Sequence, residues 1–121
     1  MNNATIHVRG YLSERKANIL SSLRRAVTSC GYDYDEILTK KTRERYYADA
    51  RSIIWKVYQG ATDYTPAQIG RDFGWNRSTV SCALNRADAL LMYNIDFSEL
   101  YDAIRGAFDM AMSEAVTNQN N

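Results

Sequence analysis

The stretch that decides the fold runs from Thr65 to Arg86 and reads Thr65-Pro-Ala-Gln-Ile-Gly-Arg-Asp-Phe-Gly74-Trp-Asn-Arg-Ser-Thr-Val-Ser-Cys-Ala-Leu-Asn-Arg86. Thr65 is a favourable N-cap residue, and Pro66 suits the first helical position because its missing N–H is not needed there. Gly74 can adopt the left-handed conformation that ends a helix, and Asn76 can cap the next one. The stretch therefore predicts two short helices joined by a tight turn.

Two short helices joined by a glycine turn are typical of a helix-turn-helix, in which the second helix enters the DNA major groove. The apolar positions of the second helix, Val80, Ala83 and Leu84, share one face at helical spacing. The joint pattern of small Gly70, apolar Phe73 and the turn glycine favours this motif. A purely structural helical hairpin shows much of the same punctuation and remains the alternative.

The composition indicates one globular domain. The chain has 121 residues, of which 45% are hydrophobic and 24% charged, and this length is enough to bury a core. No segment alternates with the period of a strand, so we expect an all-α fold of about five to six helices. Besides residues 65–91, which hold the helix-turn-helix, helices are expected over residues 13–30, 35–38, 44–59 and 96–115.

The ends of the chain lack the periodic apolar pattern of its middle. We expect residues 1–12 to form a flexible N-terminal arm and residues 117–121 to form a frayed polar tail. The single helical domain then covers residues 13–116.

Several functional classes find no support in the sequence. No apolar run approaches membrane-spanning length, and the N-terminus has no signal-peptide core. Cys30 and Cys82 have neither metal-ligand spacing nor the pattern of a disulfide framework, so we expect a reducing, cytoplasmic location. For a DNA-binding chain this location is nucleoid-associated. His7 is the only histidine, and no nucleophile–base set stands out. We therefore expect no enzymatic activity, no cofactor and no metal.

Charge is unevenly distributed along the chain, although the net charge is only +1. Residues 40–86 carry nine basic and four acidic side chains, whereas residues 87–121 carry one basic and six acidic side chains. The positive excess coincides with the candidate helix-turn-helix and the segment before it, as a surface facing phosphates requires. The acidic last helix is unsuited to DNA and indicates contact with solvent or with a basic protein partner.

A basic segment without apolar residues, residues 39–45, leads into the next helix, which is expected to start at Glu44 or Arg45. It contains Lys40, Lys41, Arg43 and Arg45. Composition alone leaves two interpretations open: a solvated connection, or a contact with phosphates or with the narrow minor groove, whose negative potential attracts arginine. Arg51, on the following helix, lies off the apolar stripe, where its side chain would reach a phosphate.

The order of the elements, together with particular residues, resembles a known family. The segments are Asp35-Glu-Ile-Leu-Thr-Lys-Lys-Thr-Arg43, Asp49-Ala-Arg-Ser-Ile-Ile54, Gln68-Ile-Gly-Arg-Asp-Phe-Gly74 and Asn76-Arg-Ser-Thr-Val80. In this order the chain resembles the C-terminal DNA-binding domain of the bacterial replication initiator DnaA, over residues 20–108. The family's hallmark at the start of the recognition helix is Asp-His-Ser/Thr-Thr-Val, of which this chain keeps the last three positions.

The resemblance implies a docking mode on DNA. It places Asn76, Arg77, Ser78 and Thr79 in the major groove, Arg43 or Arg45 in the minor groove, and Arg51, Ala67 and Gln68 against the backbone. Asn76 and Arg77 replace the family's Asp and His. Because Asn prefers the adenine edge and Arg favours guanine, the sequence read is expected to differ from the family's usual target. The family's phosphate-binding Gly-x-x-x-x-Gly-Lys-Ser/Thr loop is absent, so the likeness does not extend to its ATPase activity.

Helix geometry adds secondary contacts to this interpretation. At 100° per residue from Val80, the side chains of Cys82 and Asn85 point away from the apolar face, and Ser81 and Asn85 become further candidates for DNA contact. The sequence thus predicts sequence-specific binding of double-stranded DNA, with residues 76–91 in the major groove and residues 39–45 in the minor groove or on the backbone. A role in replication or transcription control follows from the resemblance. The alternative is a protein-interaction module that keeps the helical scaffold without strong DNA affinity.

Overall fold

A computed structural model describes the backbone of residues 3–119 and the side chains of residues 14–115. It contains α1 (Asn3–Ser29), α2 (Tyr34–Thr39), α3 (Arg45–Thr62), α4 (Pro66–Phe73), α5 (Arg77–Tyr93) and α6 (Ile95–Gln119). Over these described residues there is no strand, which confirms the all-α prediction and the expected number of helices.

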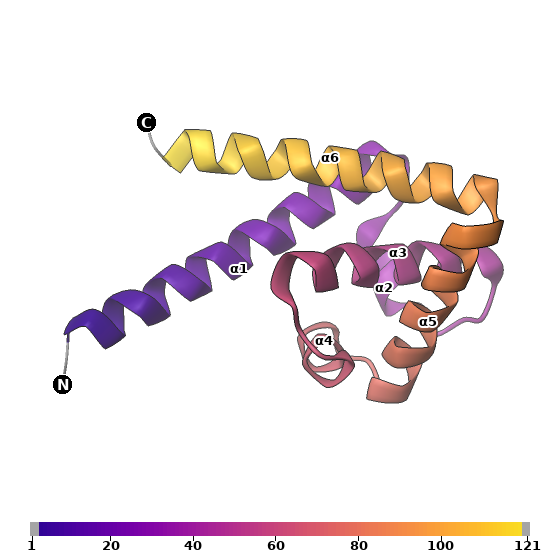
Figure 1. Cartoon of the computed structure of the whole chain (residues 1–121), viewed down its shortest axis with the longest axis horizontal. Coiled ribbons are helices and arrows are strands. Elements are labelled where there is room, and N and C mark those ends of the chain that lie inside the picture. Colours follow the sequence, from indigo (N-terminus) through magenta and orange to yellow (C-terminus); the bar gives the residue numbers. More distant parts are fainter. Residues whose placement is uncertain (1–2, 120–121) are drawn as a thin grey trace.

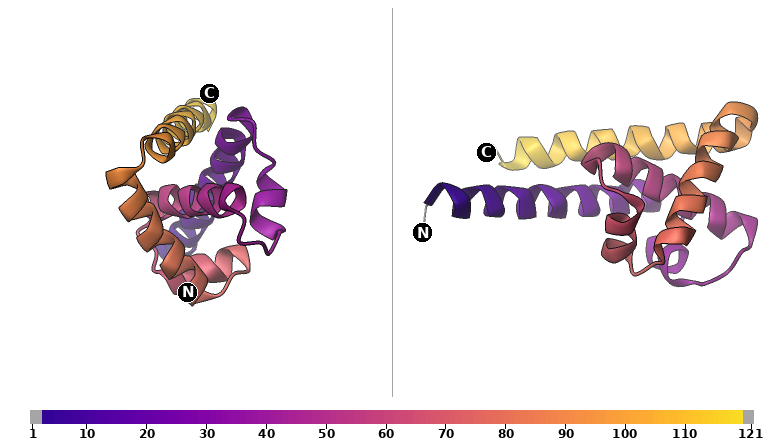
Figure 2. Two further views of the ribbon diagram at one scale, coloured as in Figure 1. Left: turned by 90° about the vertical axis from the view of Figure 1, so that its right-hand side faces the viewer. Right: turned by 60° about the horizontal axis from the view of Figure 1, so that its bottom comes forward.

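The helices are arranged around α3, which packs against each of the other five. The long helices α1 and α6 run in opposite directions along each other, so the start of α1 and the end of α6 lie at the same end of the molecule (Figure 1). α4 and the start of α5 lie on the opposite side of α3 from α6, whereas the end of α5 meets the start of α6. In the right-hand view of Figure 2, α6 forms the upper edge, and the turn between α4 and α5 reaches the lower edge. The fold thus keeps α6 away from α4 and from the first turns of α5.

The core is built on α3 because its side chains are enclosed from nearly every direction. Ile53, Ile54, Trp55 and Tyr58 are fully buried. They join apolar residues of all the other helices, among them Ile19, Leu23, Val27, Ile37, Ile69, Val80 and Ile104. The apolar residues at helical spacing in this stretch, Ala50, Ile53, Ile54 and Val57, are all buried, together with Trp55 and Tyr58.

Two predicted boundaries are wrong. The first helix begins at Asn3 and not near Ser13, so the predicted arm of residues 1–12 is helical from residue 3 onward. The last helix continues to Gln119, which makes most of the predicted tail of residues 117–121 helical as well. Once a helix has nucleated, each added residue gains one hydrogen bond that about offsets the entropy lost in fixing its backbone, and no proline interrupts either extension. The remaining parts of the predicted arm and tail lie outside the described residues.

Candidate nucleic-acid interface

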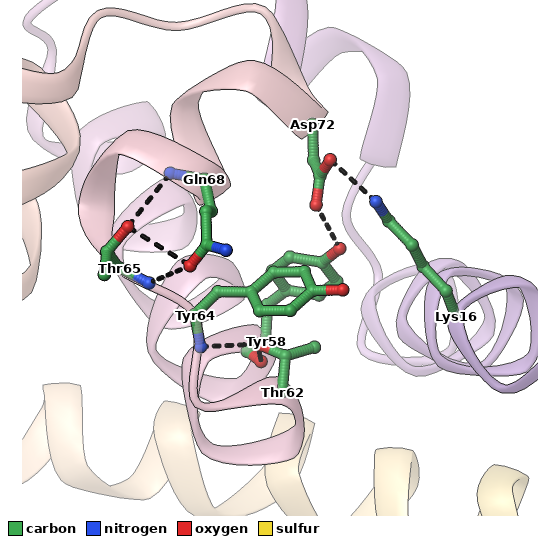
Figure 3. Close-up of polar contacts among 7 residues, drawn as sticks. All are labelled: Lys16, Tyr58, Thr62, Tyr64, Thr65, Gln68 and Asp72. Atoms are coloured by element: carbon green, nitrogen blue, oxygen red, sulfur yellow. Dashed lines mark hydrogen bonds and ion pairs between the residues drawn. The ribbon is translucent and has the colours of Figure 1, made fainter. Parts of the chain in front are cut away.

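The start of α4 is fixed by the capping box that the sequence predicts. Thr65 Oγ1 accepts a hydrogen bond from the Gln68 backbone N–H at 3.3 Å, and the Thr65 backbone N–H donates to Gln68 Oε1 at 2.9 Å (Figure 3). Pro66 follows in the first turn. These bonds satisfy backbone groups that a helix start leaves unpaired. Because the side-chain oxygen of Gln68 takes part in the cap, its NH₂ group is the part of the side chain that could contact DNA.

The position of α4 is set by a carboxylate that joins three helices. Asp72 accepts a hydrogen bond from Tyr58 Oη at 2.6 Å and pairs with Lys16 Nζ at 2.8 Å (Figure 3). The Tyr58 ring is fully buried and packs edge-on against Phe73, with ring centroids 4.9 Å apart. Burial, and then the bond to Asp72, raise the pKa of the Tyr58 phenol well above its ordinary value. A protonated Tyr58 thus ties α4 to α3, while Lys16 ties it to α1.

The turn after α4 is short because of two glycines. Gly74 adopts the left-handed conformation, with φ 73°, which costs glycine no steric strain. The Trp75 backbone N–H then donates to Gly70 O at 2.9 Å. Gly70 is buried beneath this turn, and a Cβ atom there would clash with the Trp75 carbonyl oxygen. Gly70 is therefore required for the close approach of the two helix ends.

The first turn of α5 is capped by Asn76, as the sequence predicts. Its side-chain oxygen accepts from the Ser78 backbone N–H at 2.7 Å. The structure therefore gives Asn76 a local role as a helix cap, in addition to the base contact that the resemblance implies. Its NH₂ group makes no hydrogen bond to any described residue and is available to a partner in the groove.

The rest of α5 divides into a buried face and an open face. Val80, Leu84 and Ala87 are buried against α3 and α4. The exposed side chains of its first half are those of Arg77, Ser78, Thr79, Cys82, Asn85 and Arg86, and Asp88, Ala89, Met92 and Tyr93 are exposed nearer its end. This agrees with the direction predicted for Cys82 and Asn85. Ser81 is partly covered, and on α4 the other predicted backbone contact, Ala67, is likewise half-buried.

Arg51 does not lie where a phosphate would reach it freely. Its side chain is buried, with 6% exposure. Its Nη1 donates to Lys40 O at 2.9 Å and its Nη2 donates to Thr42 O at 2.7 Å. The predicted phosphate contact is therefore replaced by a structural one, in which Arg51 holds the basic loop of residues 40–44. Burial lowers the pKa of Arg51 from its ordinary value, and the loop carbonyls compensate for the lost hydration.

The cations of the loop differ in how far they are engaged. Lys40 Nζ donates to Tyr47 Oη at 3.3 Å, and this bond raises the pKa of Lys40. Lys41 Nζ donates to Gly74 O at 3.3 Å. Arg43 has no hydrogen bond or ion pair within the part of the chain whose side chains are described. Of the two arginines that the resemblance offers for the minor groove, Arg43 is the free one, since Arg45 contacts Asp49.

Arg43 lies beside α5 across a small cavity. The cavity has a volume of about 220 Å³ and is lined by Arg43, Thr79, Cys82 and Arg86, with Ala48, Arg51, Trp55 and Ala83. The basic loop and the outer face of α5 therefore meet at one surface, which we call the loop–α5 surface. It comprises residues 40–44 and the exposed side chains of α5 from Arg77 to Arg86.

Ion pairing leaves the positive charge concentrated at this surface. Among residues 14–115, seven lysines and arginines pair with a carboxylate: Lys16, Arg24, Arg25, Arg45, Lys56, Arg86 and Arg105. The seven that do not are Arg15, Lys40, Lys41, Arg43, Arg51, Arg71 and Arg77. Four of these, Lys40, Lys41, Arg43 and Arg77, belong to the loop–α5 surface, whereas Arg51 is buried and Arg15 and Arg71 lie on α1 and α4.

The sequence alone does not single out Arg71, Arg86 or the carboxylate of Asp49 that contacts Arg86. Arg86 Nη2 lies 2.8 Å from Asp49 Oδ1, a charge contact without the angles of a hydrogen bond. Arg45 Nε contacts the other oxygen of Asp49 at 3.4 Å. No local pattern pairs Asp49 with Arg86, because they lie on different helices. The pairing reduces the charge that Arg86 offers to a ligand.

Comparisons with protein-family models, curated proteins and solved structures found no match to this chain. Among the described residues, no helix is long and apolar enough to cross a bilayer. The same residues contain no group of three or more histidine, cysteine or carboxylate side chains placed to hold a metal ion.

Proposed function

We propose that this chain binds double-stranded DNA through the loop–α5 surface. The observation that carries the proposal is the distribution of cations without a carboxylate partner: of the seven among residues 14–115, four belong to the loop–α5 surface, namely Lys40, Lys41, Arg43 and Arg77. A phosphate-rich ligand is attracted to such a surface, whereas cations neutralised by neighbouring carboxylates add little.

The proposed docking follows from the two parts of the surface. The open face of α5 enters the major groove, where Arg77 in the first turn reads a base edge and Ser78 and Thr79 contact the backbone. Arg43, next to α5 and without an internal partner, enters the adjacent minor groove. Sequence specificity then depends mainly on Arg77 and on the NH₂ group of Asn76. The resemblance to the DnaA domain suggests a role in replication or transcription control.

Fluorescence anisotropy with a short labelled duplex over a salt series tests the proposal. Wild type is expected to bind at about 50 mM salt and to weaken steeply as salt rises. The double variant Arg43→Ala/Arg77→Ala is expected to lose at least about tenfold in affinity. The matched control is Arg25→Ala/Arg105→Ala, which removes the same charge from paired arginines of α1 and α6.

Two results would overturn this proposal. One is the absence of binding by wild type at about 50 mM salt, where even non-specific contacts are strong. The other is an equal loss of affinity in the two double variants, since net charge and not the loop–α5 surface would then explain binding. For Arg77 alone, the Ala variant should weaken binding to a selected duplex more than to a random one.

A second function, a protein-interaction module, is favoured by one observation on α6. Asp96, Glu99 and Asp102 are exposed and make no ion pair with any described residue. Ile95 and Met110 on the same helix are 76% and 67% exposed. Capture of a basic protein partner by wild type, lost in Glu99→Gln/Asp102→Asn and accompanied by no DNA binding, would support this function over the first.

A further inference from the structure

Trp75, in the turn between α4 and α5, makes contacts that a simple core residue does not need. Its Nε1–H donates to Leu38 O at 2.7 Å. Leu38 lies in the last turn of α2, where carbonyl groups have no partner within the helix. The indole therefore connects the α4–α5 turn to the end of the helix from which the basic loop starts.

Two cations lie against the Trp75 ring. Lys41 Nζ is 3.5 Å from the ring centroid, and Arg51 Cζ is 4.4 Å from it. Both distances fall within the range of cation–π attraction. Lys41 also donates to Gly74 O, so this loop side chain is held by the turn through two separate contacts.

Arg51 completes the connection from the other direction. It stacks on Trp75 while its guanidinium donates to the carbonyls of Lys40 and Thr42. The planar guanidinium can stack and donate at the same time, which a lysine cannot do. Arg43, which follows Thr42, is thus positioned by a loop backbone whose conformation depends on Arg51 and Trp75.

We propose that Trp75 is a positioning residue for DNA recognition. Through Lys41 and Arg51 it locks the basic loop to the α4–α5 turn, so that Arg43 and Arg77 meet DNA at a fixed separation. The inference rests on the proposed function, because it assigns Arg43 to one groove and Arg77 to the next. It adds that the groove contacts of Arg43 and Arg77 are made by one rigid unit, because the α4–α5 turn, which leads into α5, also holds the basic loop.

The first test needs no DNA. Steady-state ¹H–¹⁵N heteronuclear NOE values of the loop amides report motion on the picosecond-to-nanosecond timescale. Trp75→Leu removes the indole hydrogen bond and the ring, and is expected to lower the values at Lys41, Thr42 and Arg43. Phe108→Leu, a core substitution on α6, is the control for a general loss of stability. Unchanged loop values in Trp75→Leu would overturn the inference whether or not the protein binds DNA.

The second test measures the contribution of Arg43 to DNA affinity in three backgrounds. We expect Arg43→Ala to weaken binding about tenfold in wild type and in Phe108→Leu, and less than about threefold in Trp75→Leu. The effect of Arg77→Ala is expected to stay the same in all three backgrounds. Trp75→Phe keeps a ring beside Lys41 and should restore most of the Arg43 effect.

The outcomes separate the two claims. If wild type fails to bind DNA, the proposed function fails, and the NOE measurement still decides the role of Trp75. If wild type binds and Arg43→Ala costs the same in Trp75→Leu as in wild type, Trp75 contributes only stability and the inference is wrong.

Discussion

Asp49 partly neutralises the positive charge at the loop–α5 surface, because its carboxylate pairs with Arg86. Its carboxylate contacts Arg86 at 2.8 Å and Arg45 at 3.4 Å, and its side chain is only 17% exposed. We expect Asp49→Asn to tighten DNA binding, because the amide has nearly the same shape but no charge. Arg86, which lines the cavity beside Arg43, would then be free to pair with a phosphate.

The size of the effect follows from counterion release. Each phosphate contact lowers the logarithm of the binding constant by about 0.9 for every tenfold rise in salt. Counted from about 1 M salt, where this term vanishes, one further contact raises the affinity about eightfold at about 0.1 M salt and about fourfold at about 0.2 M. The salt slope of Asp49→Asn should be steeper than that of wild type by about 0.9. The loss of stability should stay below about 1 kcal/mol, because Arg86 and Arg45 are 41% and 69% exposed and salt bridges of such groups contribute little.

The assay is an anisotropy titration of wild type, Asp49→Asn and Asp109→Asn against one duplex over the salt series. Asp109 pairs with Arg105 on α6 at 3.5 Å, so its variant makes the same change in net charge away from the proposed surface. The reasoning is refuted if the two variants gain equally, or if Asp49→Asn binds more weakly than wild type while remaining folded.

Two further predictions concern the scaffold that presents the surface. Tyr58→Phe should lower the free energy of unfolding by about 1.5–3 kcal/mol in urea denaturation, because it removes a hydrogen bond to the Asp72 carboxylate. The pKa of Tyr58 is raised in the folded state, so the stability that its phenol contributes is fully present below the unfolded pKa of about 10 and is lost as pH rises above it. Wild type should therefore lose more stability than Tyr58→Phe as pH is raised. Equal dependence of the unfolding free energy on pH in the two proteins would count against this. Gly70→Ala should lower the free energy of unfolding by about 1–3 kcal/mol, because the added Cβ clashes with the Trp75 carbonyl. In the control Gly60→Ala the added Cβ meets nothing within 4 Å, so this variant should be neutral or stabilising by up to about 1 kcal/mol in the same assay. Equal effects of the two substitutions would contradict the packing described for the turn.

The helix ends of the α4–α5 pair could be predicted from sequence because their signals are local. The capping box joins residues three apart, and the cap of α5 joins Asn76 and Ser78. Gly74 ends α4 through its own backbone conformation. The start of α1 at Asn3 could not be predicted in this way, because no residue in this stretch stops a helix from extending. Ser13 is a residue type that often caps helices, but it lies within α1.

The arrangement of the surface could not be predicted because its contacts join distant segments. Arg51 looked free on a helical projection, yet its partners are carbonyls of a loop that has no periodic pattern. Nothing in the local sequence around Trp75 indicates its partner, because Leu38 lies 37 positions earlier. Charge counting located the basic segment, but only the ion pairs show which of its cations are free.

The most direct test of the account is a ¹H–¹⁵N correlation spectrum of the labelled protein during titration with an unlabelled duplex. DNA binding through the loop–α5 surface predicts that the amides of Lys41–Glu44 and Arg77–Cys82 shift in a saturable way at low salt, while those of Asp102–Met110 on α6 do not. Shifts confined to α6, or a spectrum that DNA leaves unchanged at about 50 mM salt, would contradict it.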